Sequence, residues 1–205
     1  MAREKGLKGM ESRRRLLESA ACEFANWGFH ETKVSTIVKR AGLTQPSFYL
    51  YFPSKEAIFE ELVTDFHSSL RKLSESFRLE AGIKPTDVSK RVLVAVETVF
   101  RFLVTNPYLT RIGFFLAPDA KQIKGDLTLI LKDNLLAEQQ KGYFRPELEM
   151  ETVAECLIGV IEHLTASHLL PGTKDPSSLA TVVVDLFIHG MLTNDSSSIQ
   201  DIEME

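Results

Sequence analysis

The 205-residue chain is long enough to bury a sizeable core, and its 44% apolar and 25% charged residues are typical of a globular protein, which excludes wholesale disorder. No run of about eighteen apolar residues occurs, at the basic N-terminus or elsewhere, so we expect no membrane span, no export signal and a cytoplasmic location. The net charge of −4 divides unevenly: residues 1–55 carry +5 and the rest of the chain −9, so a basic head is joined to an acidic body.

Apolar residues recur at intervals of three and four almost throughout, with no strand alternation, repeat or glycine-rich phosphate loop. We therefore predict an all-α fold. A first helix spans about residues 12–27 and ends at Gly28. A second spans about residues 33–40, with Thr32 as its cap and Gly42 at its end. The first helix is predicted to bury one stripe of side chains: Leu16, Leu17, Ala20, Ala21, Phe24 and Trp27.

A third, short helix follows, capped by Thr44 and tolerating Pro46 in its first turn. Pro53 and Ser54 separate it from a fourth helix, which would be about 40 Å long if it continued to Leu79. Further helices are predicted at about residues 86–105, 119–141, 150–170 and 176–191, with a short segment at 108–116 between the first two of these. Beyond the last helix the sequence is polar and acidic, which is typical of a frayed tail.

The two short helices joined at Gly42 form the pattern of a helix-turn-helix, whose second helix enters the major groove of DNA. The third predicted helix, which is the second of this pair, carries the run FYLYF at residues 48–52. The side chains of five consecutive residues point in every direction. At helical spacing Phe48 and Phe52 share the core side. The other side carries groups that can hydrogen bond to bases and phosphates: Gln45, Ser47, Tyr49 and Tyr51. For Tyr51, core packing is an equal alternative.

The surrounding sequence reads FANWGFHETKVSTIVKRAGLTQPSFYLYFPSKEAIF. It resembles the DNA-binding domain of the tetracycline-repressor (TetR) family, whose pattern is a helix ending in F and G, a threonine pair or similar, then IA..AG and LY.YF..KE.L. The resemblance covers about a quarter of the chain. The matching positions are Phe24, Gly28, Thr32, Val34, Ile37, Ala41, Gly42, Phe48, Tyr49, Tyr51, Phe52, Lys55 and Glu56.

The resemblance implies base contacts from the third helix. Gln45, Pro46 and Ser47 stand where family members read bases or pack against thymine methyl groups. Tyr49 and Tyr51 stand where members contact phosphates or bases. These are the residues expected to carry sequence preference.

The resemblance also implies phosphate contacts from Thr32 and Lys33 at the second helix and from Lys55 at the fourth. A lysine in a first helical turn opposes the helix dipole, which favours a bound phosphate over an ordinary solvated side chain. Ser35 departs from the pattern, because many members carry arginine or another longer polar residue there, and this weakens the case for a base contact. The predicted DNA-binding residues are Thr32, Lys33, Ser35, Thr44, Gln45, Pro46, Ser47, Tyr49, Tyr51 and Lys55.

For the acidic body the resemblance implies a helical domain with a pocket for a small effector. We expect residues 1–54 to form the basic arm and DNA-binding domain, residues 55–193 the effector-binding and dimerisation domain, and residues 194–205 a disordered acidic tail. Thirteen phenylalanines favour an apolar effector, although plain core packing is the alternative for each of them. The predicted pocket residues are Phe100, Phe102, Arg111, Phe114, Phe115, Gln122 and His163.

The resemblance further implies that the last two helices form a dimer interface. Both helices carry more apolar residues than a surface position needs. A twofold dimer predicts a palindromic operator, and the family mechanism predicts a repressor that an effector releases from double-stranded DNA. The predicted interface residues are Val153, Leu157, Val160, Leu164, Val182, Val183, Leu186 and Phe187.

Several alternatives stay open at this stage. The two cysteines, Cys22 and Cys156, are expected to be buried thiols, with redox sensing as the minor alternative. No metal or cofactor motif and no nucleophile elbow is present, so we expect no enzyme and no cofactor; a small-molecule carrier or enzyme with a vestigial head is the alternative function. A further alternative is a family member that recognises a protein partner or activates transcription. The basic residues before the first stripe either reinforce DNA binding or form a solvated arm: Arg3, Lys5, Lys8, Arg13, Arg14 and Arg15.

Overall fold

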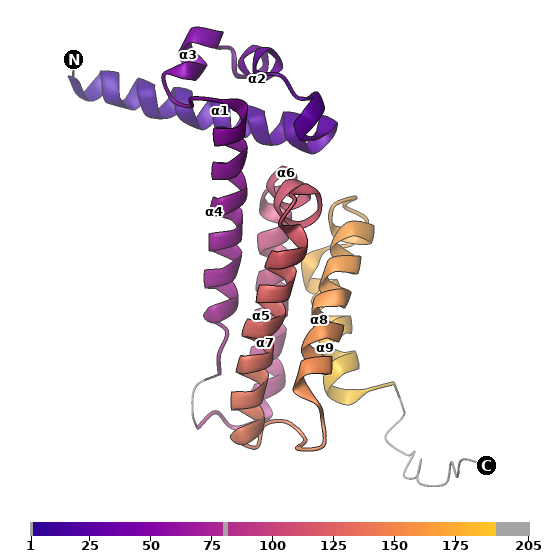
Figure 1. The fold of residues 1–205 in the computed structure, drawn as a ribbon. Helices are drawn as coiled ribbons and strands as arrows, with labels where there is room; N and C mark the ends of the chain where they lie inside the picture. Colours follow the sequence, from indigo (N-terminus) through magenta and orange to yellow (C-terminus); the bar gives the residue numbers. More distant parts are fainter. Residues whose placement is uncertain (1, 80–81, 192–205) are drawn as a thin grey trace.

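The computed structural model describes residues 2–79 and 82–191, with the side chains of residues 2–7 and 85 left out, and every regular element in these ranges is helical. This confirms the predicted all-α fold. Three helices form a head that lies across the end of an upright bundle (Figure 1): α1 (Ala2–Glu31), α2 (Val34–Ala41) and α3 (Gln45–Tyr49). Helix α4 (Lys55–Glu75) runs from the head along one side of the bundle. The predicted tail at 194–205 lies outside the described residues.

The bundle is completed by α5 (Pro85–Thr105), α7 (Ala120–Gln140), α8 (Met150–Leu164) and α9 (Pro176–His189). Short α6 (Pro107–Thr110) and the π-helical turn η1 (Arg111–Leu116) lie at the head end, and a second π-helical turn, η2 (Thr165–Leu169), follows α8. In the described residues no single helix is long and apolar enough to cross a membrane, and only the pair α5 with α6–η1, bent by 99°, reaches that length and composition.

Helix α1 is longer than predicted and contains a sharp break at Gly28, whose φ of 78° is accessible mainly to glycine. The predicted burial of Trp27 is wrong, since 65% of this side chain is exposed. The break at Gly28 instead turns Phe29 inward, where its ring stacks on that of Phe24 with centroids 5.8 Å apart. The rest of the predicted stripe is buried or half-buried, so the prediction fails only at its last residue.

The predicted cap of α2 is also wrong. Lys33 occupies the N-cap position and no side chain caps the helix. Thr32 is buried, and its hydroxyl donates to the carbonyl of Gly28 at 2.7 Å. At the other end Gly42 adopts φ 63° as predicted, and the guanidinium of Arg15 donates to the carbonyl of the preceding residue, which ties α1 to the turn.

Head and bundle share side chains in their cores. The head core takes Ile58, Leu62 and Val63 from α4, so the predicted boundary at residue 54 falls within packed structure. It also takes Ile112 from η1, whereas Phe114, two residues later, belongs to the bundle core. Helix α4 itself ends at Glu75 and is about 32 Å long, shorter than the sequence suggested. The turn η1 is therefore anchored in both cores.

Candidate nucleic-acid interface and cavity

Helix α3 lies on the side of the head that is away from the bundle (Figure 1). Thr44 caps it as predicted, since its hydroxyl accepts from the N–H of Ser47 at 3.4 Å. Phe48 is fully buried, which fixes the rotation of the helix and leaves Gln45 and Pro46 exposed. Tyr49 is 56% exposed, with its ring held edge-on against Phe48 at 5.4 Å. The predicted base-reading side chains that belong to α3 therefore lie on one surface.

Leu50, just after α3, was not singled out by the sequence pattern. It is 81% exposed, which is unusual for a leucine and leaves an apolar side chain beside Tyr49. An exposed apolar group next to hydrogen-bonding groups suits contact with thymine methyl groups in a major groove. The signal in the sequence was the consecutive run FYLYF, because a short helix cannot bury five neighbouring side chains.

Helix α2 packs against α3, and the predicted DNA contacts at its start differ in exposure. Lys33 and Ser35 are exposed and available to a phosphate backbone. The Thr32 side chain is turned inward by its bond to Gly28 and cannot reach one. Thr36, which the sequence did not single out, is exposed at the same end, with its hydroxyl donating to the carbonyl of Lys33 at 2.7 Å.

Lys55, which the sequence predicted to bind phosphate, binds backbone carbonyls of its own chain in this structure. Its ammonium group donates to the carbonyls of Phe29 at 2.9 Å, Thr32 at 3.0 Å and His30 at 3.4 Å. It also lies 4.5 Å from the centre of the Phe29 ring, at cation–π distance. The carbonyls just beyond the break in α1 lack helical partners, so they are natural acceptors for this lysine. In this conformation Lys55 ties the start of α4 to the end of α1.

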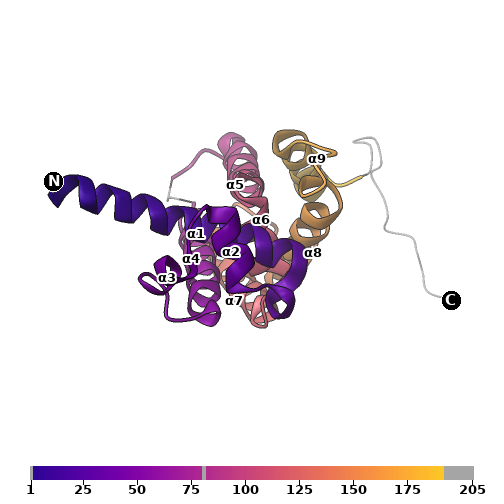
Figure 2. The same ribbon diagram turned by 90° about the horizontal axis from the view of Figure 1, so that it is seen from above.

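Tyr51 falls on the core side of its two alternatives. It is half-buried against the head core, and a Cβ added to Gly9 of α1 would lie 3.6 Å from its hydroxyl oxygen, which is ordinary contact distance. The predicted basic arm is helical in its backbone and continues α1, which extends beyond the bundle when seen from above (Figure 2). The side chains of Arg3 and Lys5 lie outside the described ones.

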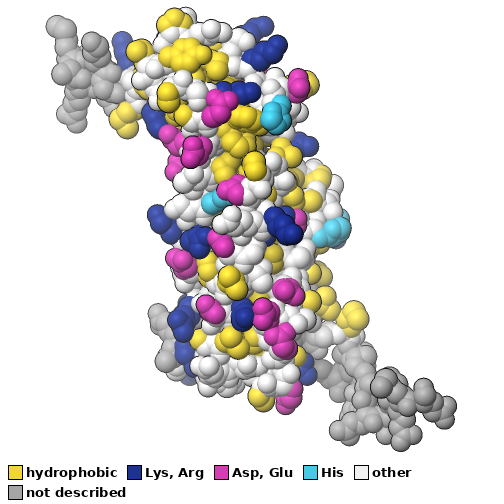
Figure 3. All heavy atoms as spheres, in the orientation of Figure 1, with side chains coloured by type: hydrophobic (Ala, Val, Ile, Leu, Met, Phe, Trp, Pro, Cys, Tyr) yellow, Lys and Arg dark blue, Asp and Glu magenta, His cyan; other side chains and the backbone are white. Residues whose placement is uncertain are grey.

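The other predicted arm residues mostly pair with carboxylates of α1 and α4. Arg13 binds Glu61 of α4 at 2.5 Å, and Arg14 binds Glu11 and Glu18 on its own helix. These carboxylates raise the pKa of Arg14. Lys8 is exposed, and Figure 3 shows further Lys and Arg side chains on both sides of the head. Carboxylates of α1 and α4 therefore partly neutralise the positive charge that the sequence predicted for this region.

The bundle encloses a cavity of about 180 Å³ between α4, α5, α7, α8 and α9. Its wall is mostly aliphatic and aromatic. Of the predicted pocket residues only Phe114 lines it. Phe100 is fully buried in the core, and Phe102 and Phe115 are half-buried in the same core. Three predicted residues are exposed and away from the cavity: Arg111, Gln122 and His163.

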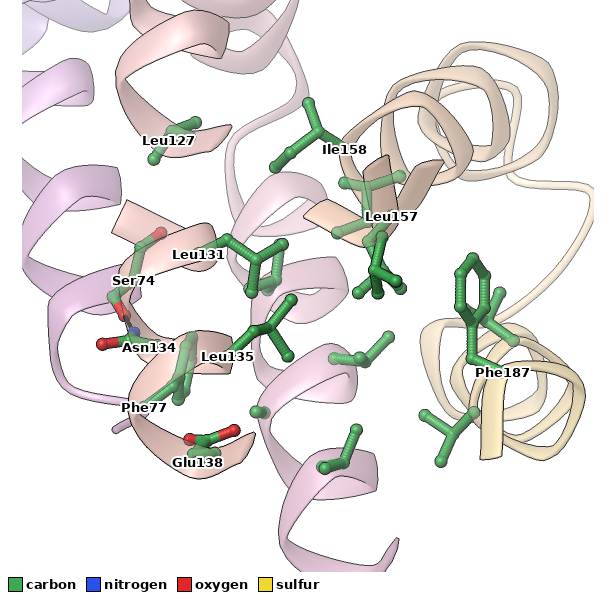
Figure 4. A pocket seen from close by; sticks show the side chains of 18 of the residues that line it. Ser74, Phe77, Leu127, Leu131, Asn134, Leu135, Glu138, Leu157, Ile158 and Phe187 are labelled. Carbon is green, nitrogen blue, oxygen red and sulfur yellow. Dashed lines mark hydrogen bonds between the residues drawn. The ribbon is translucent and has the colours of Figure 1, made fainter. Parts of the chain in front are cut away.

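Helix α7 supplies the part of the wall that sequence reasoning missed. Leu127, Leu131 and Leu135 line the cavity together with Asn134 and Glu138 (Figure 4). These five residues are spaced by three and four and therefore share one face of α7. Two polar residues within an apolar stripe were the sequence signal that could have indicated this part of the wall.

Glu138 is the buried carboxylate of this wall, with only 5% of the residue exposed. Burial raises the pKa of Glu138 above the ordinary glutamate value. The N–H of Leu79, which donates to Oε1 at 3.0 Å, and the positive charges of Lys141 and Arg78 act in the opposite direction. Lys141 in turn donates to the carbonyl of Leu79 at 2.8 Å, so this carboxylate lies in a small polar network at the edge of an apolar space.

The outer surface of α8 and α9 carries part of the predicted interface. Val182, Leu186 and Phe187 are exposed apolar side chains on α9. Val183 is buried and lines the cavity, so its side chain cannot reach a partner chain in this conformation. The remaining predicted residues on α8 are half-buried, and two of them also line the cavity: Val153, Leu157, Val160 and Leu164.

The two thiols differ in their surroundings. Cys22 is buried in α1, as predicted, and its Sγ accepts from Asn26 Nδ2 at 3.4 Å. The neighbouring thiol raises the pKa of Tyr108. The predicted burial of Cys156 is wrong, because this residue is exposed on the outer side of α8. The two sulfurs are therefore in different parts of the molecule and unsuited to one disulfide.

A helix-turn-helix carried at the end of a helical bundle with an internal cavity defines a DNA-binding transcriptional regulator. Residues 16–62 match the family model described as bacterial regulatory proteins, tetR family. The chain is 68% identical over 185 residues to the uncharacterized HTH-type transcriptional regulator YdgC of Bacillus subtilis (strain 168), covering 90% of this chain and 95% of that protein. The chain therefore belongs to the TetR family of transcriptional regulators.

Two further comparisons extend beyond the head. The fatty acid metabolism regulator protein of Bacillus subtilis (strain 168) is 27% identical over 188 residues, which cover 86% of this chain and 93% of that protein. The crystal structure of the transcriptional regulator FadR from Bacillus subtilis, in complex with stearoyl-CoA, superposes with a TM-score of 0.65 at 20% identity, covering 87% of this chain and 99% of that chain. The whole fold, including the bundle, is thus shared with solved regulators.

Proposed function

We propose that this regulator is a cytoplasmic repressor that binds a palindromic operator as a homodimer and is released by a small effector. The observation that carries the proposal is the surface of α3. Buried Phe48 orients the helix so that Gln45, Pro46 and Tyr49 face outward together. An exposed amide and phenol can hydrogen bond to base edges in a major groove, and a proline ring can pack against a thymine methyl group. Lys33 would contribute phosphate contact from α2.

Dimerisation is supported by the outer face of α9. Val182 is 67% exposed, and Leu186 and Phe187 lie exposed on the same helix. Exposed apolar residues concentrated on one helix favour association, and a twofold contact between two copies would place the two α3 helices symmetrically on DNA. Two symmetric readers require an operator with twofold symmetry.

The proposed effector binds in the cavity of the bundle. The aliphatic wall favours an apolar molecule, and the relatives support an elongated one: a regulator of fatty acid metabolism and FadR in complex with stearoyl-CoA. The cavity wall includes Leu70 of α4 and Phe114 of η1. Both elements also pack in the head core, so an effector that displaced them would move the reading helices.

The proposal is tested by selecting random duplex DNA on the purified protein and sequencing the bound pool. A palindrome whose affinity falls steeply with salt supports a dimeric reader. Failure to enrich any sequence, from protein shown to be folded, rejects it and favours the carrier or enzyme alternative. A reporter placed behind the selected sequence then distinguishes the two signs of regulation, because loss of the gene raises expression under a repressor and lowers it under an activator.

A further inference from the structure

The cavity has one polar end. Ser74 of α4 and Asn134 and Glu138 of α7 lie together on this side, and the apolar side chains of Leu157 and Phe187 lie on the opposite side (Figure 4). Asn134 and Glu138 are four residues apart and therefore share a helix face. A molecule that fills this space meets a polar group at one end and hydrocarbon at the other.

The oxygens at this end keep capacity to accept hydrogen bonds, and Asn134 Nδ2 keeps one N–H that can donate. The Ser74 hydroxyl already donates to the carbonyl of Leu70 at 3.0 Å, and Asn134 Nδ2 donates to the carbonyl of Ser74 at 3.3 Å. Glu138 Oε1 accepts from Leu79 at 3.0 Å. Within residues 2–79 and 82–191, no donor is bonded to Glu138 Oε2 or Asn134 Oδ1. A bound molecule satisfies these oxygens only if it donates.

Because Glu138 is buried, the difference between a donating and an anionic head group should affect binding strongly. Glu138 is buried and has one hydrogen bond, from the N–H of Leu79, so a donor or a cation supplied by the effector would further stabilise its charged form. A carboxylate or phosphate placed here would instead face Glu138 at short range. Arg91 is the other charged residue in the described wall, and it is exposed on α5. The inner polar groups thus favour a donor over an anion.

We propose that the effector is an amphipathic molecule whose hydrogen-bond-donating head, an amine or a hydroxyl, binds Glu138 and Asn134 while its apolar part lies toward Phe187. This inference rests on the proposed function, namely that the bundle cavity is the effector site. Both head groups satisfy the same acceptors, and only the amine adds a charge attracted to the carboxylate.

The test compares decylamine, decanol and decanoate, which share one chain length, by calorimetric titration of the full chain below the micelle concentration of each. We expect decylamine to bind most tightly and decanoate at least about tenfold more weakly, since a charged hydrogen bond contributes about 1.5–3 kcal/mol. Tighter binding of decanol than of decylamine would assign a neutral donor instead of a cation. Equal or tighter binding of decanoate overturns the proposal.

Variants separate this head-group assignment from the existence of the site. Glu138→Gln should lower the affinity for decylamine at least about tenfold and narrow its advantage over decanoate, whereas Glu147→Gln, the same change of charge on an exposed loop residue, should not. Ala95→Phe, which places a ring in the cavity wall, should weaken all three ligands. If none of the three binds wild-type protein, both the cavity as effector site and the head-group assignment fail. If all three bind equally and Ala95→Phe weakens each, only the head-group assignment fails.

Discussion

The ring of Phe66 on α4 occupies the space that a side chain on Gly113 of η1 would need. A Cβ added to Gly113 would lie 2.4 Å from Cδ1 of Phe66, far inside contact distance. The next residue of α4, His67, bonds through Nε2 to the carbonyl of Gly113 at 2.8 Å. Two neighbouring side chains of α4 therefore hold one glycine of the turn that joins the two cores.

Gly113→Ala is expected to destabilise the protein by about 1–3 kcal/mol, because the new methyl group must displace a packed aromatic ring. The control is Gly125→Ala in α7, where a Cβ would meet no atom within 4 Å and helix propensity should raise stability slightly. Thermal unfolding measures both. Equal melting temperatures for the two variants would show that the contact between Phe66 and Gly113 is easily relaxed.

Lys55→Ala should destabilise the head by about 1–2 kcal/mol, since it leaves the carbonyls of Phe29 and Thr32 without their donor. It should change the salt dependence of DNA binding little. Lys33→Ala should do the reverse, reducing the salt slope by about one unit at nearly unchanged stability. Chemical denaturation and DNA titrations at several salt concentrations distinguish the two lysines. A reduced salt slope for Lys55→Ala would restore it to the phosphate-binding set.

Gln45→Ala should weaken binding to the selected operator by about 1–3 kcal/mol and broaden the sequence preference, because the exposed amide is the group on α3 best suited to pair with a base edge. Gln140→Ala, an exposed position at the far end of α7, is the matched control. Repeating the DNA selection with each variant checks the prediction. An unchanged consensus for Gln45→Ala would argue against base reading by this residue.

Val182→Glu should shift the protein toward monomer, since a charge placed in an apolar interface between copies would lose its hydration. Val94→Glu is the control, because Val94 is also exposed and helical but lies on α5. Sedimentation velocity at several concentrations reports the assembly state of each. A dimer that survives Val182→Glu would remove α9 from the interface.

Glu138 should make stability fall with rising pH. Its pKa is raised in the folded protein, so the folded state binds the proton more tightly than the unfolded state does. Stability is then lost from about the unfolded pKa near 4.5 up to the raised folded value, and stays constant above it. Glu138→Gln should flatten this slope.

Glu149 should change the pH dependence of stability in the opposite direction to Glu138. The hydroxyl and N–H of Thr152 lower the pKa of Glu149, so its contribution is present above the unfolded pKa and is lost as pH falls through the folded value. Unfolding by urea between about pH 2.5 and about pH 8 measures both effects, because the Glu149 contribution is lost below its unfolded pKa. If the two Glu→Gln variants changed the pH dependence in the same direction, the buried position of Glu138 would not control its titration.

The sequence alone identified the family and most of the head. The positions of Gly42, Phe48 and Phe52 located the helix-turn-helix in the sequence. A left-handed turn and a buried helix face each impose a local residue pattern, so both can be found without the tertiary structure. It erred where a side chain responds to distant neighbours. Trp27 follows the helical period yet is exposed. The sequence also did not predict that Lys55 binds carbonyls at the end of α1, and its phosphate contact stays a prediction.

In the bundle the sequence determined that the segments are helical and apolar, because periodicity is a property of each segment by itself. It did not determine which apolar face surrounds an empty space. That choice depends on how five helices pack, and it placed Val183 inside and Val182 outside, and brought Glu138 of α7 to the backbone of Leu79. Tertiary packing alone decided where the cavity and its polar end lie.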